Sequence, residues 1–261
     1  MVYLEFLQRL HELLEPPTYL EIGVRHGDSL ALARAPSIGI DPAYELQTEI
    51  GSNTTLFRET SDEYFDRADV LEPFDRRPIS LAFIDGMHLV EFALRDFINV
   101  ERYSDWTSIA VFDDILPREV EEATRKRSTR VWTGDVYKIT EILARHRPDL
   151  ICLRVATDPT GLLLVLGLDR DSAVLDERYD EVVLDTIMPD PQPLPPDVIE
   201  REGVLEPEAV LSASFWTVLR DARSRDIRRE EGLRQLRRAL RRDFGLPVRR
   251  GPLRRLLLAR A

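Results

Sequence analysis

Apolar and polar positions along the first two thirds of the chain predict helices and strands in alternation. Residues from Leu4 to Leu14 carry leucines at helical spacing, and Pro16 and Pro17 end this helix. Short, mostly apolar runs, typical of strands buried on both faces, lie at residues 19–23, 37–41, 54–57, 79–85 and 108–113. Helical patterns between them lie at residues 30–33, 61–71 and 89–103. This order predicts a parallel sheet with helices on both faces.

The next two apolar runs predict a different kind of pairing. Residues 150–156 and 161–168 are joined only by the turn from Asp158 to Gly161, which is too short for a helical crossover. The two strands are therefore expected to pair antiparallel as a hairpin. The fold class that follows is α/β, a Rossmann-like doubly wound sheet that ends in an antiparallel hairpin.

The character of the sequence changes after this hairpin. A proline-rich stretch at residues 189–196 predicts a semi-rigid linker outside the core. Beyond it, apolar residues from Trp216 to Phe244 keep helical spacing among many arginines, and Gly245 and Pro247 end that segment. We therefore divide the chain into a main domain at residues 1–185, a linker at 186–211 and a basic helical extension at 212–261.

Charge follows the same division. The 261 residues carry a net charge of −11, but residues 212–261 hold 15 Arg, no Lys and 5 acidic residues, about +10, which leaves the rest at about −21. Such an acidic body would repel a nucleic acid, so the extension is expected to pack on the body or on a second copy of the chain as a homo-oligomer. Contact of residues 252–260 with an anionic membrane stays an alternative. The preference for Arg over Lys indicates a GC-rich bacterial source.

Location is indicated by two further features. The lone Cys152 has no partner for an internal disulfide, which favours a reducing compartment. No apolar run approaches the ~20 residues that cross a bilayer, and the charged N-terminal segment lacks the apolar core of a signal peptide. We therefore expect a cytoplasmic protein.

Two features at the ends of the first two strands indicate a nucleoside-containing ligand. Gly23 and Gly27 follow the first strand and allow a turn whose backbone passes close to a ligand. Asp41 ends the second strand, where a carboxylate accepts hydrogen bonds from ribose hydroxyls. Each feature also has a structural explanation, since glycine caps many such turns and Asp41 can cap the next helix.

The ends of the next two strands carry the chain's richest set of chemical groups. Asp85 follows one strand, Asp113 and Asp114 follow the other, and His88 lies three residues after Asp85. Three carboxylates that converge repel one another unless a cation joins them, and an all-oxygen set suits Mg²⁺. His88, with an unperturbed pKa near ~6.5, suits a general base. The structural alternative is that the acids cap strand ends and His88 is a solvated loop residue.

These motifs together resemble those of a known enzyme family. Glu-Ile-Gly-x-x-x-Gly-x-Ser at residues 21–29, Asp41, Ile-Asp-Gly-x-His at 84–88 and Asp113-Asp114 resemble class I S-adenosylmethionine-dependent methyltransferases, within them the metal-dependent O-methyltransferases of the macrocin type. The resemblance spans roughly residues 18–170. It implies a seven-stranded sheet whose last strand is antiparallel.

The resemblance also implies roles for individual residues. Cofactor contacts are expected from residues Glu21, Gly23, Gly27, Asp41, Ser61, Asp62 and Asp85. Ser61 and Asp62 would lie near the adenine, and Asp85, Asp113 and Asp114 would bind Mg²⁺ with His88 as the base. Arg25 and His26 depart from the family pattern of small residues in the glycine turn. Residues 132–138, from Trp132 to Lys138, resemble a family segment that follows the metal strand. Asp135 and Lys138 there would face substrate, although Asp135 is equally a candidate helix cap.

The function that follows is transfer of a methyl group from S-adenosyl-L-methionine to a hydroxyl of a small molecule or sugar, with Mg²⁺. The alternative is a catalytically inactive methyltransferase-like binding module that holds a nucleoside or glycan partner.

Overall fold

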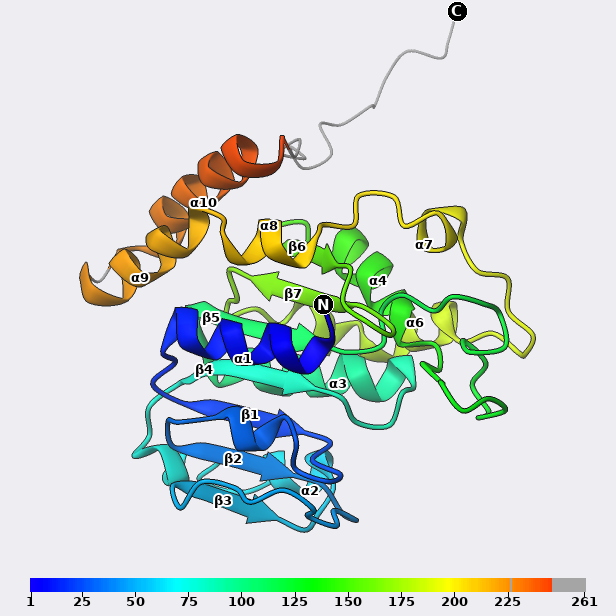
Figure 1. Ribbon diagram of the computed structural model, residues 1–261, viewed down its shortest axis with the longest axis horizontal. Helices are drawn as coiled ribbons and strands as arrows, with labels where there is room; N and C mark the ends of the chain where they lie inside the picture. Colours follow the sequence, from blue (N-terminus) through cyan, green and yellow to red (C-terminus); the bar gives the residue numbers. More distant parts are fainter. Residues whose placement is uncertain (226, 246–261) are drawn as a thin grey trace, which may run out of the picture.

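The fold is a seven-stranded sheet between two layers of helices (Figure 1). The computed structural model describes residues 1–225 and 227–245. The strands run in the order β3-β2-β1-β4-β5-β7-β6. Their bounds are β1 Tyr19–Ile22, β2 Ser37–Ile40, β3 Thr54–Phe57, β4 Ile79–Ile84, β5 Ser104–Phe112, β6 Ile151–Val155 and β7 Leu162–Leu166.

The pairing pattern confirms the predicted fold class. Strands β3, β2, β1, β4 and β5 pair in parallel, whereas β7 pairs antiparallel with both β5 and β6. The order of the parallel strands reverses between β1 and β4, so this is the switch point, where open α/β sheets bind their ligands. The carboxyl ends of β1, β2, β4 and β5 all meet at one edge near this point.

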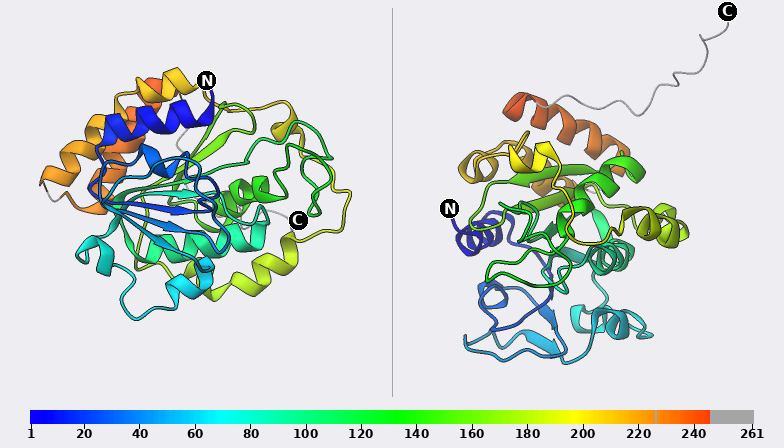
Figure 2. Two further views of the ribbon diagram at one scale, coloured as in Figure 1. Left: turned by 60° about the horizontal axis from the view of Figure 1, so that its bottom comes forward. Right: turned by 90° about the vertical axis from the view of Figure 1, so that its right-hand side faces the viewer.

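Each face of the sheet has its own apolar core, because side chains of successive strand residues point to opposite faces. One core lies under α2 (Ser61–Phe65), α3 (Val90–Arg102), α4 (Ile139–His146), α5 (Val174–Glu177) and α6 (Tyr179–Thr186). The other lies under α1 (Tyr3–Leu14), α8 (Pro207–Leu211), α9 (Phe215–Arg225) and α10 (Arg229–Phe244). Figure 2 shows the N-terminal and C-terminal helices together on one side of the sheet and α3 on the other.

Two predicted helices are shorter than expected. The pattern at residues 30–33 forms only a 3-10 turn, η1 (Leu30–Leu32), since the next strand starts at Ser37 and leaves too few residues to form an α-helix. The helix expected at 61–71 is α2, which ends at Phe65 and is followed by a second 3-10 turn, η2 (Glu72–Phe74). Strand β5 starts at Ser104, four residues earlier than predicted.

The proline-rich stretch is packed against the protein, contrary to the prediction that it lies outside the core. Gln192 and Leu194 within it are buried, as is Val198 of α7 (Pro196–Ile199), the helix that begins at its last residue. Leu194 and Val198 share a small apolar cluster with Tyr137. Proline content alone does not show this, because the apolar residues that anchor the stretch are scattered between the prolines. The domain boundaries at 185/186 and 211/212 stay a prediction.

The basic extension forms two helices whose apolar sides are buried against the sheet. Leu233, Leu236 and Leu240 of α10 belong to the same core as α1 and the strands, and Gly245 caps α10 at a φ of 64°. Arg229 pairs with Asp149 and Asp169 of the acidic body. In the described residues the apolar side of α10 thus packs on the sheet of the same chain. A homo-oligomer stays a prediction. The expected contact of residues 252–260 with a membrane lies outside the described residues.

Within residues 1–225 and 227–245, no helix has the length and apolar content needed to span a bilayer.

Candidate active site

The glycine turn after β1 is packed directly against the end of β4. Gly23 has a φ of +92°, and a Cβ added to it would lie 2.0 Å from the backbone oxygen of Asp85. Gly27 has a φ of +85°, and its Cβ would lie 2.9 Å from the Leu46 side chain. Only glycine adopts the positive φ at position 23 without strain, and only glycine lacks the Cβ that would collide with Asp85. The two predicted glycines therefore allow the β1 turn and the β4 end to touch.

Glu21 lies inside the protein at the end of β1 and is fully buried. Its carboxyl oxygens accept hydrogen bonds from the Tyr19 hydroxyl at 2.6 Å and from Ser29 Oγ at 2.7 Å. Burial raises the pKa of Glu21 to about 8, although both hydrogen bonds favour the charged form. Through its hydrogen bond with Ser29, Glu21 thus holds the glycine turn, which the predicted cofactor would cover, against β1.

Asp41 stands at the tip of β2, facing the same turn. Its Oδ2 accepts a hydrogen bond from the backbone N–H of Arg25 at 2.8 Å, and its Oδ1 accepts one from Ala43 N–H at 2.6 Å. A carboxylate has about four acceptor positions, so two remain for other donors. The Nδ1 atom of His26 lies 3.1 Å from the Glu45 backbone oxygen, which ties this loop to the residues after β2.

Ser61 and Asp62 begin α2, beyond β3. Thr60 and Glu63 form a capping box that sets the start of this helix. Asp62 pairs with Arg95 of α3 at 3.1 Å, and the Ser61 hydroxyl bonds to the buried Asp96. Burial raises the pKa of Asp96 to about 7. Both predicted adenine-side residues are therefore joined to α3.

The ends of β4 and β5 bring Asp85, His88 and Asp114 into one cluster. His88 Nε2 lies 3.2 Å from Asp85 Oδ1, and His88 Nδ1 lies 2.7 Å from Asp114 Oδ2. One ligand atom from each of the three residues lies within 4.8 Å of the others, which is close enough for one metal ion. His88 and Asp114 both have positive φ angles, 56° and 62°. Such backbone strain in non-glycine residues is concentrated at functional sites.

Asp113 lies next to this cluster but is turned differently. Its Oδ1 accepts the backbone N–H of Asp114 at 2.8 Å, and its side chain is buried. The three residues grouped by geometry are thus Asp85, His88 and Asp114, and the predicted metal role of Asp113 stays a prediction. Burial, together with the charges of Asp114 and Asp85, holds the pKa of Asp113 well above its usual range.

The electrostatics of the cluster favour bound positive charge. Burial raises the pKa of Asp85, and the neighbouring Asp114 raises it further. Burial disfavours a charged His88, but hydrogen bonds and charge interactions with Asp114 and Asp85 outweigh this and raise its pKa to about 11. Without another cation, His88 itself therefore carries the charge that offsets the two carboxylates.

Several residues at this edge were missed from the sequence. Trp132 stacks on His88 with ring centroids 5.1 Å apart and an interplanar angle of 1°. Tyr3 of α1 stacks on Phe83 of β4, and burial together with Asp113 and Asp85 raises its pKa. The sequence alone gives neither residue a role, since Trp132 only begins the segment at residues 132–138, 44 positions after His88, and Tyr3 sits in an ordinary amphipathic helix.

Asp135 and Lys138 do not have the expected substrate-facing position. Asp135 is fully buried, and its Oδ1 accepts the backbone N–H of Val90 at the start of α3, 2.9 Å away. Its Oδ2 pairs with Arg125 at 2.8 Å. Lys138 donates to the Thr186 backbone oxygen. Asp135 is thus a cap, as the alternative proposed, but it caps a helix distant in sequence.

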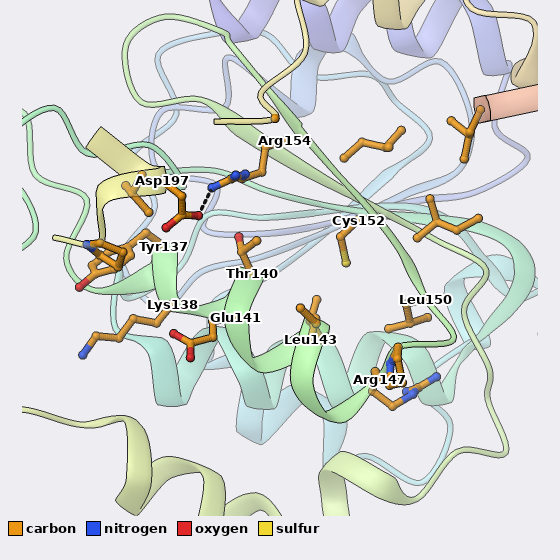
Figure 3. A pocket seen from close by; sticks show the side chains of 18 of the residues that line it. Tyr137, Lys138, Thr140, Glu141, Leu143, Arg147, Leu150, Cys152, Arg154 and Asp197 are labelled. Carbon is orange, nitrogen blue, oxygen red and sulfur yellow. Dashed lines mark hydrogen bonds and ion pairs between the residues drawn. The ribbon is translucent and has the colours of Figure 1, made fainter. Parts of the chain in front are cut away.

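A cavity of about 540 Å³ lies away from this edge. It runs along β6 between α4, α7 and α10, and Thr140, Leu143, Cys152 and Arg154 are among its lining residues (Figure 3). The predicted cofactor and metal residues do not line it. The chemistry-bearing groups are therefore at the carboxyl edge and not in this cavity.

Comparison with known proteins identifies the central part of the fold. Residues 20–115 match the sequence profile of a family described as a methyltransferase domain, so the methyltransferase resemblance is confirmed over that stretch. It includes the glycine turn, Asp41 and the acids after β4 and β5. No relative among curated proteins matches the chain significantly.

Solved structures resemble the fold in outline. A putative O-methyltransferase from Klebsiella pneumoniae is 17% identical, with 64% of this chain and 80% of that chain covered and a TM-score of 0.45. The O-methyltransferase from Bacillus cereus, in complex with SAH, is 14% identical over 63% and 80%, with a TM-score of 0.47. TomG, an O-methyltransferase from Streptomyces achromogenes, is 16% identical over 64% and 79%, with a TM-score of 0.46. At this similarity the likenesses carry no argument about substrate or mechanism.

Proposed function

We propose that the protein, with its methyltransferase domain at residues 20–115, transfers a methyl group from S-adenosyl-L-methionine to a hydroxyl of a small molecule or sugar. The observation that carries this proposal is the meeting of Asp85, His88 and Asp114 at the same sheet edge as the glycine turn and Asp41. Such a transfer needs a nucleoside-binding site next to a cluster that can hold a proton or a cation.

The proposed cofactor site uses the chain's backbone as much as its side chains. S-adenosyl-L-methionine supplies a methyl group activated by its sulfonium. The turn at Gly23 and Gly27 has no side chains to block a ligand that lies against it, and Asp41 keeps acceptor positions for ribose hydroxyls. Ser61 and Asp62 would border the adenine, and Glu21 braces the methionine side.

A divalent cation, Mg²⁺ in our proposal, fits the carboxylates of Asp85 and Asp114. Their oxygens and His88 meet the distance requirement for one ion, and carboxylate oxygens are the ligands that Mg²⁺ prefers. Such an ion would act as a Lewis acid that lowers the pKa of a hydroxyl. Neighbouring hydroxyls, as on a sugar or a catechol ring, suit such a site because both can approach one ion.

His88 is the proposed base. Without a bound cation, Asp85 and Asp114 favour the protonated form of His88 and raise its pKa to about 11. Positive charge held by these carboxylates would oppose the proton and return the pKa of His88 toward its ordinary value. The imidazole would then accept the hydroxyl proton as the methyl group is transferred.

The first test is binding. Thermal unfolding of the full chain is measured with S-adenosyl-L-methionine, with and without Mg²⁺. A ligand at 100 times its Kd stabilises the folded state by about 2.7 kcal/mol, so we expect a clear rise in Tm. The absence of any shift up to millimolar cofactor would contradict the cofactor assignment.

The second test is turnover, with pyrocatechol as a model acceptor and cofactor labelled in the methyl group. We expect His88→Ala to lower the rate at least ~100-fold, the usual contribution of a general base, while the cofactor still raises the Tm. His146→Ala is the matched control, because His146 lies on α4 outside the cluster. EDTA should abolish the activity; full activity in EDTA would refute the metal assignment. Cofactor binding without methylation of pyrocatechol or of simple sugars would favour the inactive binding module.

A further inference from the structure

The segment at residues 122–135 is closed on itself and packs against His88. The Thr133 and Gly134 backbone N–H groups donate to the Glu122 backbone oxygen at 2.9 and 3.2 Å. Gly134 has a φ of +57°, and a Cβ added there would lie 1.7 Å from the backbone oxygen of His88. The segment backbone therefore touches the backbone of His88 directly, and only glycine permits this approach.

Charged groups hold the same segment to α3. Arg125 pairs with Glu91 of α3 and with the buried Asp135. Asp135 also accepts the Val90 N–H at the start of α3, just after His88. The polypeptide on either side of Trp132 is thus joined to the β4–α3 connection that carries His88.

Trp132 is held at both ends of its indole ring system. The indole N–H donates to the Thr124 backbone oxygen at 2.6 Å, and the ring lies parallel to the His88 ring. The backbone oxygen of Trp132 lies 2.9 Å from His88 Nδ1. The stack thereby fixes the plane of the imidazole, and Nδ1 faces both this oxygen and Asp114 Oδ2, which lies 2.7 Å away.

The stack also sets the direction of the two ring nitrogens. With the plane of the imidazole fixed against Trp132, Nε2 points to the Asp85 side, where it lies 3.2 Å from Oδ1. Nδ1 points to the other side, toward the Trp132 backbone oxygen and Asp114 Oδ2.

We propose that Trp132 is a positioning residue for the reaction: its ring and its backbone oxygen hold the His88 imidazole in the plane and direction in which it meets the reacting hydroxyl. This inference rests on the proposed function of His88 as the base. Trp132 lies 44 positions after His88 in the sequence and belongs neither to the predicted metal ligands nor to the glycine turn. Misplacement of a reacting group by about 1 Å costs on the order of 100-fold in rate, so loss of the stack should be measurable.

The variants separate the aromatic ring from generic packing. Trp132→Leu keeps the backbone oxygen and an apolar side chain but removes the stacking face. Trp132→Phe restores an aromatic face without the indole N–H. Trp106→Phe is the matched control, because Trp106 is also half-buried and its indole N–H also donates to a backbone oxygen, that of Ile227 at 2.8 Å.

The first readout does not depend on activity. The chain has four histidines, so the NMR signals of the His88 ring in the full chain can be assigned by their loss in His88→Gln. We expect the wild type to show a ring-current shift of the His88 Cε1 proton. Trp132→Leu should lose the shift, Trp132→Phe should keep most of it, and Trp106→Phe should leave it unchanged. Identical His88 signals in the wild type and Trp132→Leu would overturn the proposal.

The second readout is the methylation of pyrocatechol. We expect Trp132→Leu to lower kcat by about 10- to 100-fold with the KM for S-adenosyl-L-methionine unchanged, and Trp132→Phe to recover most of kcat. Equal losses in kcat for both variants, or wild-type kcat in Trp132→Leu, would refute the positioning role. If the wild type does not methylate pyrocatechol, the proposed function fails for this acceptor, while the NMR result still decides whether Trp132 orients His88.

Discussion

Replacement of Gly23 by alanine tests whether the β1 turn meets the end of β4 as closely as described. The added Cβ would lie 2.0 Å from the Asp85 backbone oxygen and 2.6 Å from its carbonyl carbon. Backbone atoms cannot move aside as a flexible side chain does, so overpacking should cost about 1–3 kcal/mol. The positive φ of 92° adds about 1–2 kcal/mol for a residue with a Cβ. Gly23→Ala should therefore lower the free energy of unfolding by about 2–5 kcal/mol.

A matched glycine separates the two contributions. Gly245 ends α10 with a φ of +64°, and among residues 1–225 and 227–245 no atom lies within 4 Å of a Cβ placed there. Gly245→Ala should therefore show only the conformational cost of about 1–2 kcal/mol. The difference between the two variants measures the collision with Asp85.

Urea unfolding at equilibrium measures both variants, and thermal unfolding gives a second estimate at about 2–4 °C per kcal/mol for a domain of this size. If Asp85 moves to relieve the collision, Gly23→Ala should also weaken the stabilisation by S-adenosyl-L-methionine. If Gly23→Ala costs no more than Gly245→Ala, the close approach of the two strand ends is refuted.

Two further predictions concern buried residues. The pKa of Glu21 is raised from 4.5 to about 8 in the folded protein, so as pH rises the unfolded chain loses this proton first. The contribution of the protonated Glu21 to the free energy of unfolding is therefore full below about pH 4.5 and is lost between there and about pH 8. Glu21→Gln should flatten that part of the pH dependence in urea unfolding at pH 5 and 8.5, and an unchanged slope would contradict the assignment. Leu236 of α10 is fully buried, so Leu236→Ala should lower the main unfolding transition by about 2–5 kcal/mol, whereas the exposed Arg238→Ala should change it little. Loss of α10 without a change in the main transition would show instead that the extension folds separately.

Local patterns were sufficient for the elements that carry the site. Apolar runs marked all five parallel strands, and the short turn between residues 156 and 161 required the antiparallel pairing of β6 and β7. Because parallel strands end at a common edge, the acids after β4 and β5 were expected to converge, and Asp85 and Asp114 do so. These inferences depend on periodicity and chain direction, which are properties of short stretches of sequence.

Local patterns failed where the outcome depended on neighbours. The helix expected after Gly27 is only a 3-10 turn because the next strand begins too soon, and the proline-rich stretch is anchored by a few apolar residues that meet Tyr137 from elsewhere in the chain. Glu21 is an acid in an apolar strand, and its burial with Tyr19 and Ser29 becomes evident only when the turn is folded back.

The chain's order of strands, its glycine turn and its acids at strand ends follow from residues read a few positions at a time, because hydrophobic spacing and backbone freedom act locally. The environment of those acids does not. His88 lies between Asp85 and Asp114, and its ring stacks on that of Trp132, because the β4–α3 connection packs against two parts of the β5–η3 connection at the sheet edge. Desolvation and charge pairing at that edge, which set the pKa of His88, arise from contacts between segments up to 44 residues apart and exist only in the folded protein.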